Sequence, residues 1–423
     1  MKRQILHTPE GVRDIYGSEY KKKLVLEERL QKVLRLYGYQ DIQTPTFEYF
    51  DVFSKEVGTT PSRELYKFFD KEGETLVLRP DFTPSIARVA TTVLDSDGMP
   101  IRLCYKGNTF TNQSSYQGRL RETTQLGAEL IGLDSVEADA EMIALAVQGL
   151  REAGLTDFQI HIGNVQFFEG LMRETELSEE DTQHLRGLIK NRNYFGVDEL
   201  LERMQSKVTV KTALQKLPEL VGGAEVLKEA KQIALNTDIF GAVERLEAIY
   251  QILVSYGVEG HITFDLSMSG TYGYYTGIIF RAYTYGTGNA IVKGGRYDNL
   301  LGKFGKDLPS IGFVIVADEL LSAFHRQKIE IPYPCKNSFV LYEEDRITEA
   351  ISLAKEFRSS GKQTVLTKKR DDKSLEDYMQ YARENGCISM VYLKAGIEME
   401  MINLVTGTRK IVSKKIKKMR VQA

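Results

Sequence analysis

Apolar residues recur with two different periods along the first part of the chain, one typical of strands and one of helices. Residues 101–105 form an apolar run, and residues 119–131 alternate apolar and polar positions, which predicts an antiparallel pair of strands. Apolar residues recur every three to four positions between Ser18 and Gly38. A capped amphipathic helix is predicted for residues 135–154. This part of the chain should therefore contain a hairpin flanked by helices.

The stretch 270–298 predicts a second pair of strands around a glycine-containing turn. Gly294 and Gly295 would let the backbone bend or let another group approach it closely. Tyr274 and Tyr275 are expected on opposite faces of one strand, so that one ring reaches a pocket while the other packs. The bare pattern favours a well-packed core hairpin over a pocket.

Helical periodicity also divides the chain into larger parts. It runs through about 178–256 and separates two segments that have strand patterns, so residues 1–330 are predicted to form one domain with this helical insertion. Pro332 and Pro334 mark a linker. Residues 335–423 then alternate three apolar runs with two helical segments, which predicts a small α/β domain at the C-terminus.

Polar side chains in two of these segments are candidates for a binding site. Two prolines in RPDFTP fix the backbone around Asp81 and Thr83. The carboxylate of Asp81 could bind an ammonium group or cap the helix that follows, and a cap is the commoner role. One face of the 119–131 strand is polar and carries Arg119, Arg121, Gln125 and Glu129. Such groups in mid-sheet need partners, and a ligand-binding cleft explains them more simply than mutual pairing does.

Composition and charge exclude several classes of protein. A formal net charge of −2 gives no overall attraction to nucleic acid or to an acidic membrane. The five histidines form no cluster, so no metal site is expected, and Cys104, Cys335 and Cys387 are expected to be free buried thiols. No signal sequence or membrane span is apparent, which predicts a cytoplasmic protein. The final KKIKKMR run could contact RNA, but a solvated tail is the commoner case.

Several motifs occur in an order that resembles the histidyl-tRNA synthetases and their non-catalytic relatives. They are TPEGVRDIY, TPTFEYFDVF, LRPDFTPSIAR, QGRLRETTQLGAELIG, YYTGIIF and GGRYDNLLGKFG. The resemblance implies an α+β fold of the class II synthetase type, with a mostly antiparallel sheet flanked by helices. It also implies a dimer with the Pro45 segment at its interface. The C-terminal domain resembles a shortened anticodon-binding domain.

The sequence departs from the synthetases where they bind ATP. Thr111 follows Phe110 where those enzymes have an arginine for the α-phosphate. Gly270 stands where they have an arginine that activates the histidine carboxylate. The chain reads Asp318-Glu319 where their third motif ends in a glutamate and an arginine for the γ-phosphate.

These departures argue against amino-acid activation. Adenylate formation needs cations around the charge that develops on phosphorus, and the loss of one such donor typically costs ~10²–10³ in rate. A carboxylate such as Glu319 at about 4 Å from a phosphate charge would repel it by roughly 4 kcal/mol at an effective dielectric constant near 20. We therefore expect no catalytic residues, although Arg119 and Arg121 remain as possible residual anion-binding residues.

The amino-acid side of the implied pocket is retained. Asp81 stands where the synthetases place a glutamate that binds the α-ammonium group, beside Thr83. The remaining matches are to residues that hold the ammonium group and the imidazole, and they are Gln125, Glu129, Tyr274 and Tyr275. Carboxylates pair with cations, and Tyr and Glu can hydrogen-bond both imidazole nitrogens, so this chemistry fits histidine.

A histidine pocket without phosphate-binding residues resembles the regulatory subunit of ATP phosphoribosyltransferase, a paralogue of the synthetases. The resemblance implies a non-catalytic protein that needs no cofactor and partners the short-form catalytic subunit, as homodimers within a hetero-octamer. It also implies feedback regulation of histidine biosynthesis by histidine, with no membrane or nucleic-acid partner. Three alternatives are an active histidyl-tRNA synthetase, a relative that aminoacylates another acceptor, and an inherited pocket that binds nothing.

Overall fold

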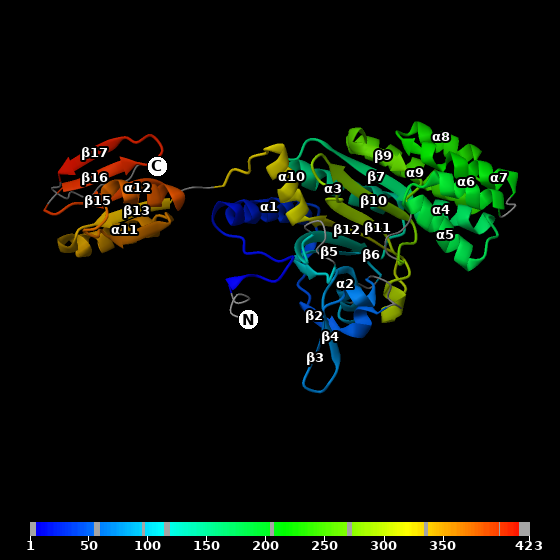
Figure 1. Cartoon of the computed structure of the whole chain (residues 1–423), viewed down its shortest axis with the longest axis horizontal. Coiled ribbons are helices and arrows are strands. Elements are labelled where there is room, and N and C mark those ends of the chain that lie inside the picture. The colour runs from blue at the N-terminus through cyan, green and yellow to red at the C-terminus, as the bar shows by residue number, and fades with distance from the viewer. Residues whose placement is uncertain are drawn as a thin grey trace. The chain divides into compact units, whose positions relative to one another are not determined.

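The structure is a computed structural model, and it describes residues 6–54, 60–94, 98–113, 119–203, 207–268, 273–333, 337–396 and 398–413. The chain divides into two compact units, one of residues 1–14 and 23–331 and the other of residues 15–22 and 332–423 (Figure 1). Each unit has its own sheet. Gly270, Pro334, Cys335 and the basic C-terminal run lie outside the described residues, as do parts of the loops that precede Arg119 and Tyr274.

The first unit is built on a sheet of nine strands among the described residues, in the order β1-β5-β6-β12-β11-β10-β7-β9-β8. The strands in that order are Gln40–Asp41, Ile101–Phe110, Glu122–Ile131, Ser310–Val316, Val292–Arg296, Ile278–Thr284, Phe158–Asn164, Ile262–Asp265 and Val221–Gly222. The β1–β5 and β7–β9 pairs are parallel, and the other neighbouring pairs are antiparallel. This agrees with the mostly antiparallel sheet that was predicted.

The two faces of this sheet have different roles, because successive side chains along a strand point to opposite sides. On one face, Leu126, Ala128 and Leu130 of β6 are fully buried in the main core. That core also takes in side chains of α1 (Gly17–Leu36) and α3 (Val136–Ala153). The alternate residues of β6 point to the other face, where α2 (Thr83–Thr92) packs in a second, smaller cluster.

Local signals explain where the main helices begin and end. The Ser135 hydroxyl accepts a hydrogen bond from the Ala138 amide at the start of α3, and Gly154 ends the helix with a φ of 107° that favours glycine. Asn236 caps α9 (Thr237–Ser255) in the same way. The α10 helix (Ala317–Gln327) follows directly on β12.

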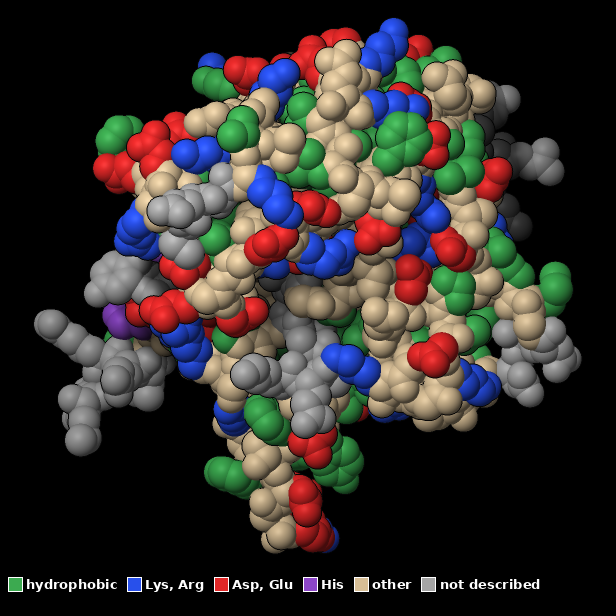
Figure 2. All heavy atoms as spheres, turned by 90° about the vertical axis from the view of Figure 1, so that its right-hand side faces the viewer, with side chains coloured by type: hydrophobic (Ala, Val, Ile, Leu, Met, Phe, Trp, Pro, Cys, Tyr) green, Lys and Arg blue, Asp and Glu red, His purple; other side chains and the backbone are tan. Residues whose placement is uncertain are grey.

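The helices predicted for residues 178–256 are present and continue from α4 (Val165–Glu174). They are α5 (Glu179–Lys190), α6 (Tyr194–Arg203), α7 (Val208–Lys216), α8 (Glu225–Gln232) and α9. Acidic and basic side chains are interspersed over the helical side of the chain, and no large patch of one sign faces the viewer (Figure 2). None of the helices, as far as residues are described, is long and apolar enough to cross a membrane.

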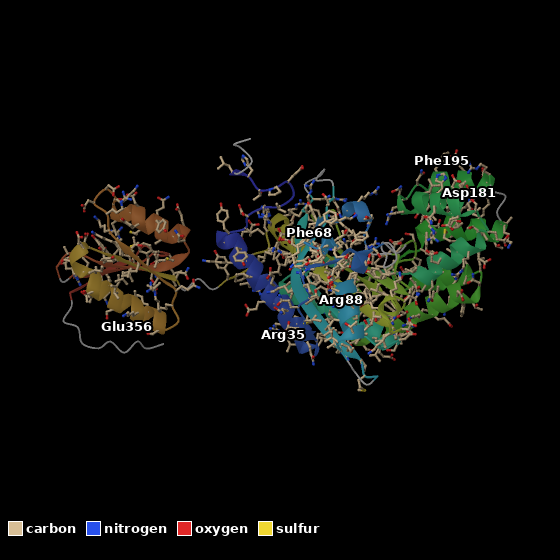
Figure 3. The ribbon with its side chains drawn as sticks, turned by 90° about the horizontal axis from the view of Figure 1, so that it is seen from below. Arg35, Phe68, Arg88, Asp181, Phe195 and Glu356 are labelled. Carbon is tan, nitrogen blue, oxygen red and sulfur yellow. The ribbon has the colours of Figure 1, made fainter. Side chains whose placement is uncertain are left out.

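A second sheet has three strands in the order β2-β4-β3, and these strands lie between β1 and β5 along the chain. Its strands are Phe47–Tyr49, Thr75–Leu78 and Lys67–Phe69. Val77 is buried, whereas Phe47 and Phe68 contact each other edge to face and are exposed. Figure 3 labels Phe68. Short 3₁₀ helices occur at Phe50–Phe53, Ser62–Glu64, Leu217–Glu219, Glu259–His261, Leu301–Phe304 and Glu344–Arg346.

The second unit has a five-stranded sheet among the described residues, in the order β14-β13-β15-β16-β17. The strands in that order are Thr364–Lys368, Asn337–Tyr342, Cys387–Leu393, Glu398–Asn403 and Arg409–Ser413, with helices α11 (Ile347–Ser359) and α12 (Leu375–Glu384). The first three strands are parallel and match the apolar runs seen in the sequence. The antiparallel β16 and β17 were not predicted, because charged residues interrupt their apolar positions.

Candidate functional site: a cavity with two buried carboxylates

A cavity of about 500 Å³, measured as the space free of atoms and including its open mouth, lies on the face of the large sheet opposite α3. The register places Glu129 of β6 opposite Gly312 of β12, and Gly312 opposite Gly295 of β11. The lining residues are Pro80, Asp81, Thr83, Tyr105, Gln125, Glu129, Tyr274, Tyr275, Lys293, Gly295, Tyr297, Gly312, Phe313, Val314 and Val316. The six residues predicted to bind histidine are thus brought together around one cavity.

Two glycines make room for the cavity. A Cβ atom at Gly312 would fall on the Glu129 carboxylate, and a Cβ atom at Gly295 would lie 2.7 Å from the ring of Tyr275. At Gly294 the missing side chain makes room for Phe280, which lies on the core side of the sheet and not in the cavity. The close approach that the glycine pair predicted therefore occurs on both faces of β11.

Glu129 is a deeply buried acid in the wall of the cavity, and the residue is 1% exposed. The Thr83 hydroxyl donates a hydrogen bond of 2.9 Å to Oε1, and the Tyr297 hydroxyl donates one of 2.5 Å to Oε2. Burial raises the pKa of Glu129 to about 8, although both hydrogen bonds lower it. Near pH 7 this group can therefore gain or lose its proton as its surroundings change.

Asp81 lies in the turn before α2. Its Oδ1 atom accepts a long hydrogen bond from the Thr83 amide at 3.3 Å, and its Oδ2 atom accepts one from the Tyr274 hydroxyl at 3.4 Å. Burial raises the pKa of Asp81 as well. No basic side chain in the described part of the chain forms an ion pair with Asp81 or Glu129. Asp81 thus lines the cavity and contacts the amide of the first residue of α2, although Phe82 occupies the N-cap position and α2 has no side-chain cap.

Gln125 adds an acceptor without a partner. Its Oε1 atom is buried and forms no hydrogen bond within the described part of the protein. A buried amide oxygen left without a donor costs roughly 1–3 kcal/mol. Since Gln125 lines the cavity, a ligand that carries an N–H group could satisfy this atom.

The two adjacent tyrosines differ from their predicted placement. Tyr274 and Tyr275 lie in a turn rather than on a strand, and both line the cavity. Their ring centroids are 4.9 Å apart, with planes inclined at 51°. The expectation that they point to opposite faces was wrong, because strand alternation does not apply to a turn.

Three further lining residues were not singled out from the sequence. Tyr105 and Tyr297 are buried beside Glu129, and Lys293 lies on β11 two positions before Gly295. Strand alternation from Gly295 could have found Lys293, since residues two apart share a face. Tyr297 belongs to the GGRYD motif, but its contact with Glu129 depends on a register that the local pattern does not reveal.

The two acids that stand, by the motif resemblance, where synthetases end their third motif are held by other groups. Asp318 forms an ion pair with Lys23 at 2.8 Å and accepts a hydrogen bond of 2.6 Å from the Thr124 amide. Glu319 accepts one of 2.9 Å from the Asn289 side chain. Both acids therefore have partners within the fold.

Arg119 and Arg121 do not line the cavity. The β6 strand begins at Glu122, so both arginines precede it, and the prediction of a strand from residue 119 was too long. Arg119 is exposed. The Arg121 side chain donates to the Gln113 carbonyl at 3.0 Å.

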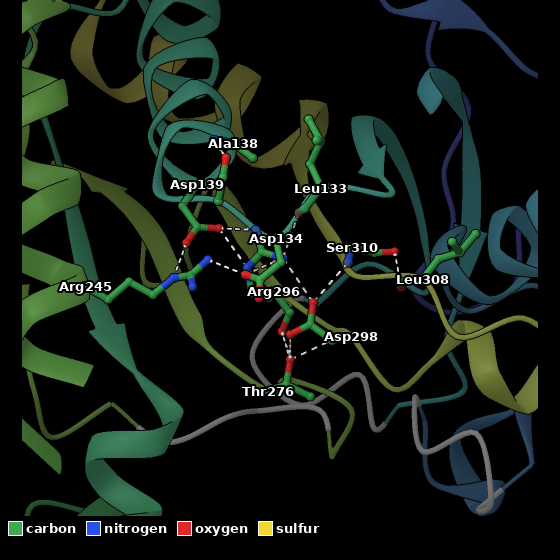
Figure 4. A network of polar contacts seen from close by, with 11 residues as sticks. Leu133, Asp134, Ala138, Asp139, Arg245, Thr276, Arg296, Asp298, Leu308 and Ser310 are labelled. Carbon is green, nitrogen blue, oxygen red and sulfur yellow. Dashed lines mark hydrogen bonds and ion pairs between the residues drawn. The ribbon is translucent and has the colours of Figure 1, made fainter. Parts of the chain in front are cut away.

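A second buried polar cluster lies beside this cavity, on the core side of β11. Asp139 of α3 is 0% exposed and binds Arg296 at 2.6 Å and Arg245 at 2.7 Å (Figure 4). Asp298 pairs with Arg296 at 3.0 Å and accepts a hydrogen bond from the Ser310 amide. This network connects α3, α9 and β11, and its charges are paired with one another. Elsewhere, Cys104 is a free buried thiol and Cys387 is buried.

Comparison with known proteins supports the resemblance seen in the motifs. The family model described as histidyl-tRNA synthetase matches residues 11–320. A histidyl-tRNA synthetase from Nostoc has a TM-score of 0.77 at 22% identity, covering 96% of each chain, which shows a shared fold. The predicted class II synthetase-like fold is confirmed.

More similar proteins carry a different name. The ATP phosphoribosyltransferase regulatory subunit of Acetivibrio thermocellus is 41% identical over 84% of this chain and 85% of that protein, and the one from Ruminiclostridium cellulolyticum is 37% identical over 93% and 94%. A Bacillus halodurans protein described as an ATP phosphoribosyltransferase regulatory subunit/histidyl-tRNA synthetase has a TM-score of 0.82 at 31% identity, covering 93% of this chain and 99% of its own. This chain belongs to the family of ATP phosphoribosyltransferase regulatory subunits, within the wider family of histidyl-tRNA synthetases.

Proposed function

We propose that this chain is a non-catalytic subunit that binds histidine in the carboxylate-lined cavity and regulates a short-form ATP phosphoribosyltransferase catalytic subunit. The observation that carries the proposal is a pair of acids in the cavity, buried Glu129 and partly buried Asp81, which have hydroxyl and amide partners but no cation among the described residues. An ammonium group or a protonated imidazole supplies the missing positive charge.

Histidine matches this arrangement group by group. Its ammonium group pairs with Asp81 and donates to the vacant Gln125 oxygen. Its imidazole reaches Glu129, whose carboxyl group can accept from one ring nitrogen or donate to it, depending on protonation. A pKa near 8 lets Glu129 ionise when a positively charged ring arrives, and binding would then release a proton.

The site that would bind ATP supports a role without catalysis. By the motif resemblance, Asp318 and Glu319 stand where phosphate-binding cations are needed, and their contacts with Lys23 and Asn289 hold them within the fold. The Thr111 amide donates a hydrogen bond to the Arg121 carbonyl, just beyond the paired ends of β5 and β6. Histidine bound without ATP can act only by favouring one state of an assembly over another, as feedback inhibition requires.

The test is a reconstitution. The purified chain is mixed with a short-form catalytic subunit, and phosphoribosyl-ATP formation is followed with and without histidine. We expect activity to rise on mixing and to fall when histidine is added. The mass of the complex by light scattering tests the hetero-octamer. No gain on mixing would contradict the proposal, and histidine-dependent ATP–pyrophosphate exchange by the chain alone would identify an active synthetase instead.

A further inference from the structure

Lys293 is the one basic residue among those that line the cavity in the described part of the chain. It lies on β11, two residues before Gly295, with its side chain on the cavity face. No hydrogen bond or ion pair within the described residues involves its ammonium group. A half-buried lysine without an anionic partner is uncommon, because burial disfavours its charge.

The surroundings of Lys293 add to this observation. Arg281 of β10 is its direct cross-strand neighbour, and like charges that face each other on one sheet face are destabilising. Burial lowers the pKa of Lys293, with Arg281 acting in the same direction, while Glu319 and Asp81 raise it. The cavity therefore has a positive end at Lys293 and acidic groups at Asp81 and Glu129.

A free α-amino acid has the matching distribution of charge. Its ammonium and carboxylate groups are attached to one carbon, so a site that holds the ammonium on Asp81 places the carboxylate nearby. A lysine ammonium on a flexible stem suits a single carboxylate as a point charge. We propose that Lys293 binds the α-carboxylate of the ligand and makes the cavity selective for amino acids over the corresponding amines or alcohols.

This inference rests on the proposed function, because it takes histidine as the ligand. Its test compares histidine with histidinol, in which a hydroxymethyl group replaces the carboxylate. Titration calorimetry on the full chain measures both ligands with the wild type, Lys293→Met and Lys293→Arg. Methionine keeps most of the buried stem, and arginine keeps the charge. Lys306→Met removes an exposed lysine and is the matched control.

We expect the wild type to bind histidine roughly 10–100-fold more tightly than histidinol, the range of a charge-assisted hydrogen bond. Lys293→Met should abolish most of that preference by weakening histidine binding, and it should leave histidinol binding within about threefold. Lys293→Arg should retain most of the preference, and Lys306→Met should behave as the wild type. Thermal unfolding of each variant shows whether it is folded.

Two results would overturn the inference while histidine binding by the wild type still supports the proposed function. One is a Lys293→Met variant that keeps the full preference for histidine. The other is an equal loss for both ligands, which would make Lys293 a packing residue. A wild type that binds neither ligand would instead refute the histidine-binding proposal, and the inference with it.

Discussion

Two buried acids on opposite sides of β11 have different surroundings. Asp139 is 0% exposed and is paired with Arg296 and Arg245, so its charge is balanced within the fold. Glu129 is 1% exposed; it accepts hydrogen bonds from the hydroxyls of Thr83 and Tyr297, and it forms no ion pair with any described residue. A buried acid with its own cations contributes to the architecture, whereas one without them is available for a positive ligand.

One strand serves both sites. Arg296 ends β11 on the core side, and the next residue, Tyr297, reaches the cavity side. Because successive side chains alternate, the ion-pair network that fixes Arg296 also fixes the strand end from which Tyr297 contacts Glu129. The ion-pair network around Asp139 (the closed site) thereby positions part of the cavity around Glu129 (the open site).

The largest effect is expected from breaking the closed site. Arg296→Met leaves Asp139 buried with one arginine in place of two, and loss of one partner of a buried ion pair typically costs about 3–5 kcal/mol. Urea unfolding followed by circular dichroism measures the change in the free energy of unfolding. A loss below about 1 kcal/mol would show that the network is not needed for stability.

The raised pKa of Glu129 in the open site should make the free energy of unfolding depend on pH. The pKa of Glu129 is about 8 in the folded protein and near 4.5 when exposed, so between these values the folded state holds the extra proton. Stability should therefore fall as pH rises, by about 3 kcal/mol between pH 5.5 and 8 from this group alone. Urea unfolding of the wild type and Glu129→Gln across this range isolates the contribution, since glutamine does not titrate. Parallel curves for the two proteins would contradict the raised pKa.

Ligand binding sharpens the comparison further. Glu129→Gln keeps the shape of the side chain but cannot ionise, so it should weaken histidine binding by about 10–100-fold. Calorimetry at about pH 5.5, where Glu129 and the free imidazole both hold their protons, in two buffers with different ionisation enthalpies should also show proton release for the wild type and none for this variant. Glu244→Gln makes the same chemical change at an exposed site on α9 and should have no effect. Equal binding by Glu129→Gln would place the ligand elsewhere.

The smallest effect is expected at an exposed ion pair. Arg173 and Asp238 are 2.8 Å apart, but their side chains are 60% and 64% exposed. Water screens such a pair, so Arg173→Met should change the free energy of unfolding by less than about 0.5 kcal/mol. Urea unfolding followed by circular dichroism measures this change, which serves as the reference for an exposed ion pair. A loss close to that of Arg296→Met would mean that burial is not what separates the two kinds of pair.

Much of the architecture follows from local pattern, and the limits of that pattern are physical. Alternation correctly predicted that Gln125 and Glu129 share one face of β6. It also ran past the end of the strand and placed Arg119 and Arg121 in the sheet, since a loop can show the same alternation. The helices of 178–256 were recognisable because their apolar residues recur at helical spacing, most clearly in α9.

The site itself could be predicted only in part. Motif resemblance located the residues around Asp81 and Glu129, but it did not identify Lys293 and Tyr297 as residues that line the cavity. Their positions depend on which strands pair and in which register, and this is decided by contacts distant in sequence.

The glycine at position 312 has a consequence for how this sequence can change. The Glu129 carboxylate occupies the volume that a methyl group at position 312 would need, so the two positions are not independent. A library that varies position 312 alone should return almost only glycine among folded, ligand-binding clones. One that also varies position 129 removes the clash with the carboxylate but not the contact with the Ala128 carbonyl oxygen, 2.9 Å from the added carbon, so glycine should still dominate at position 312.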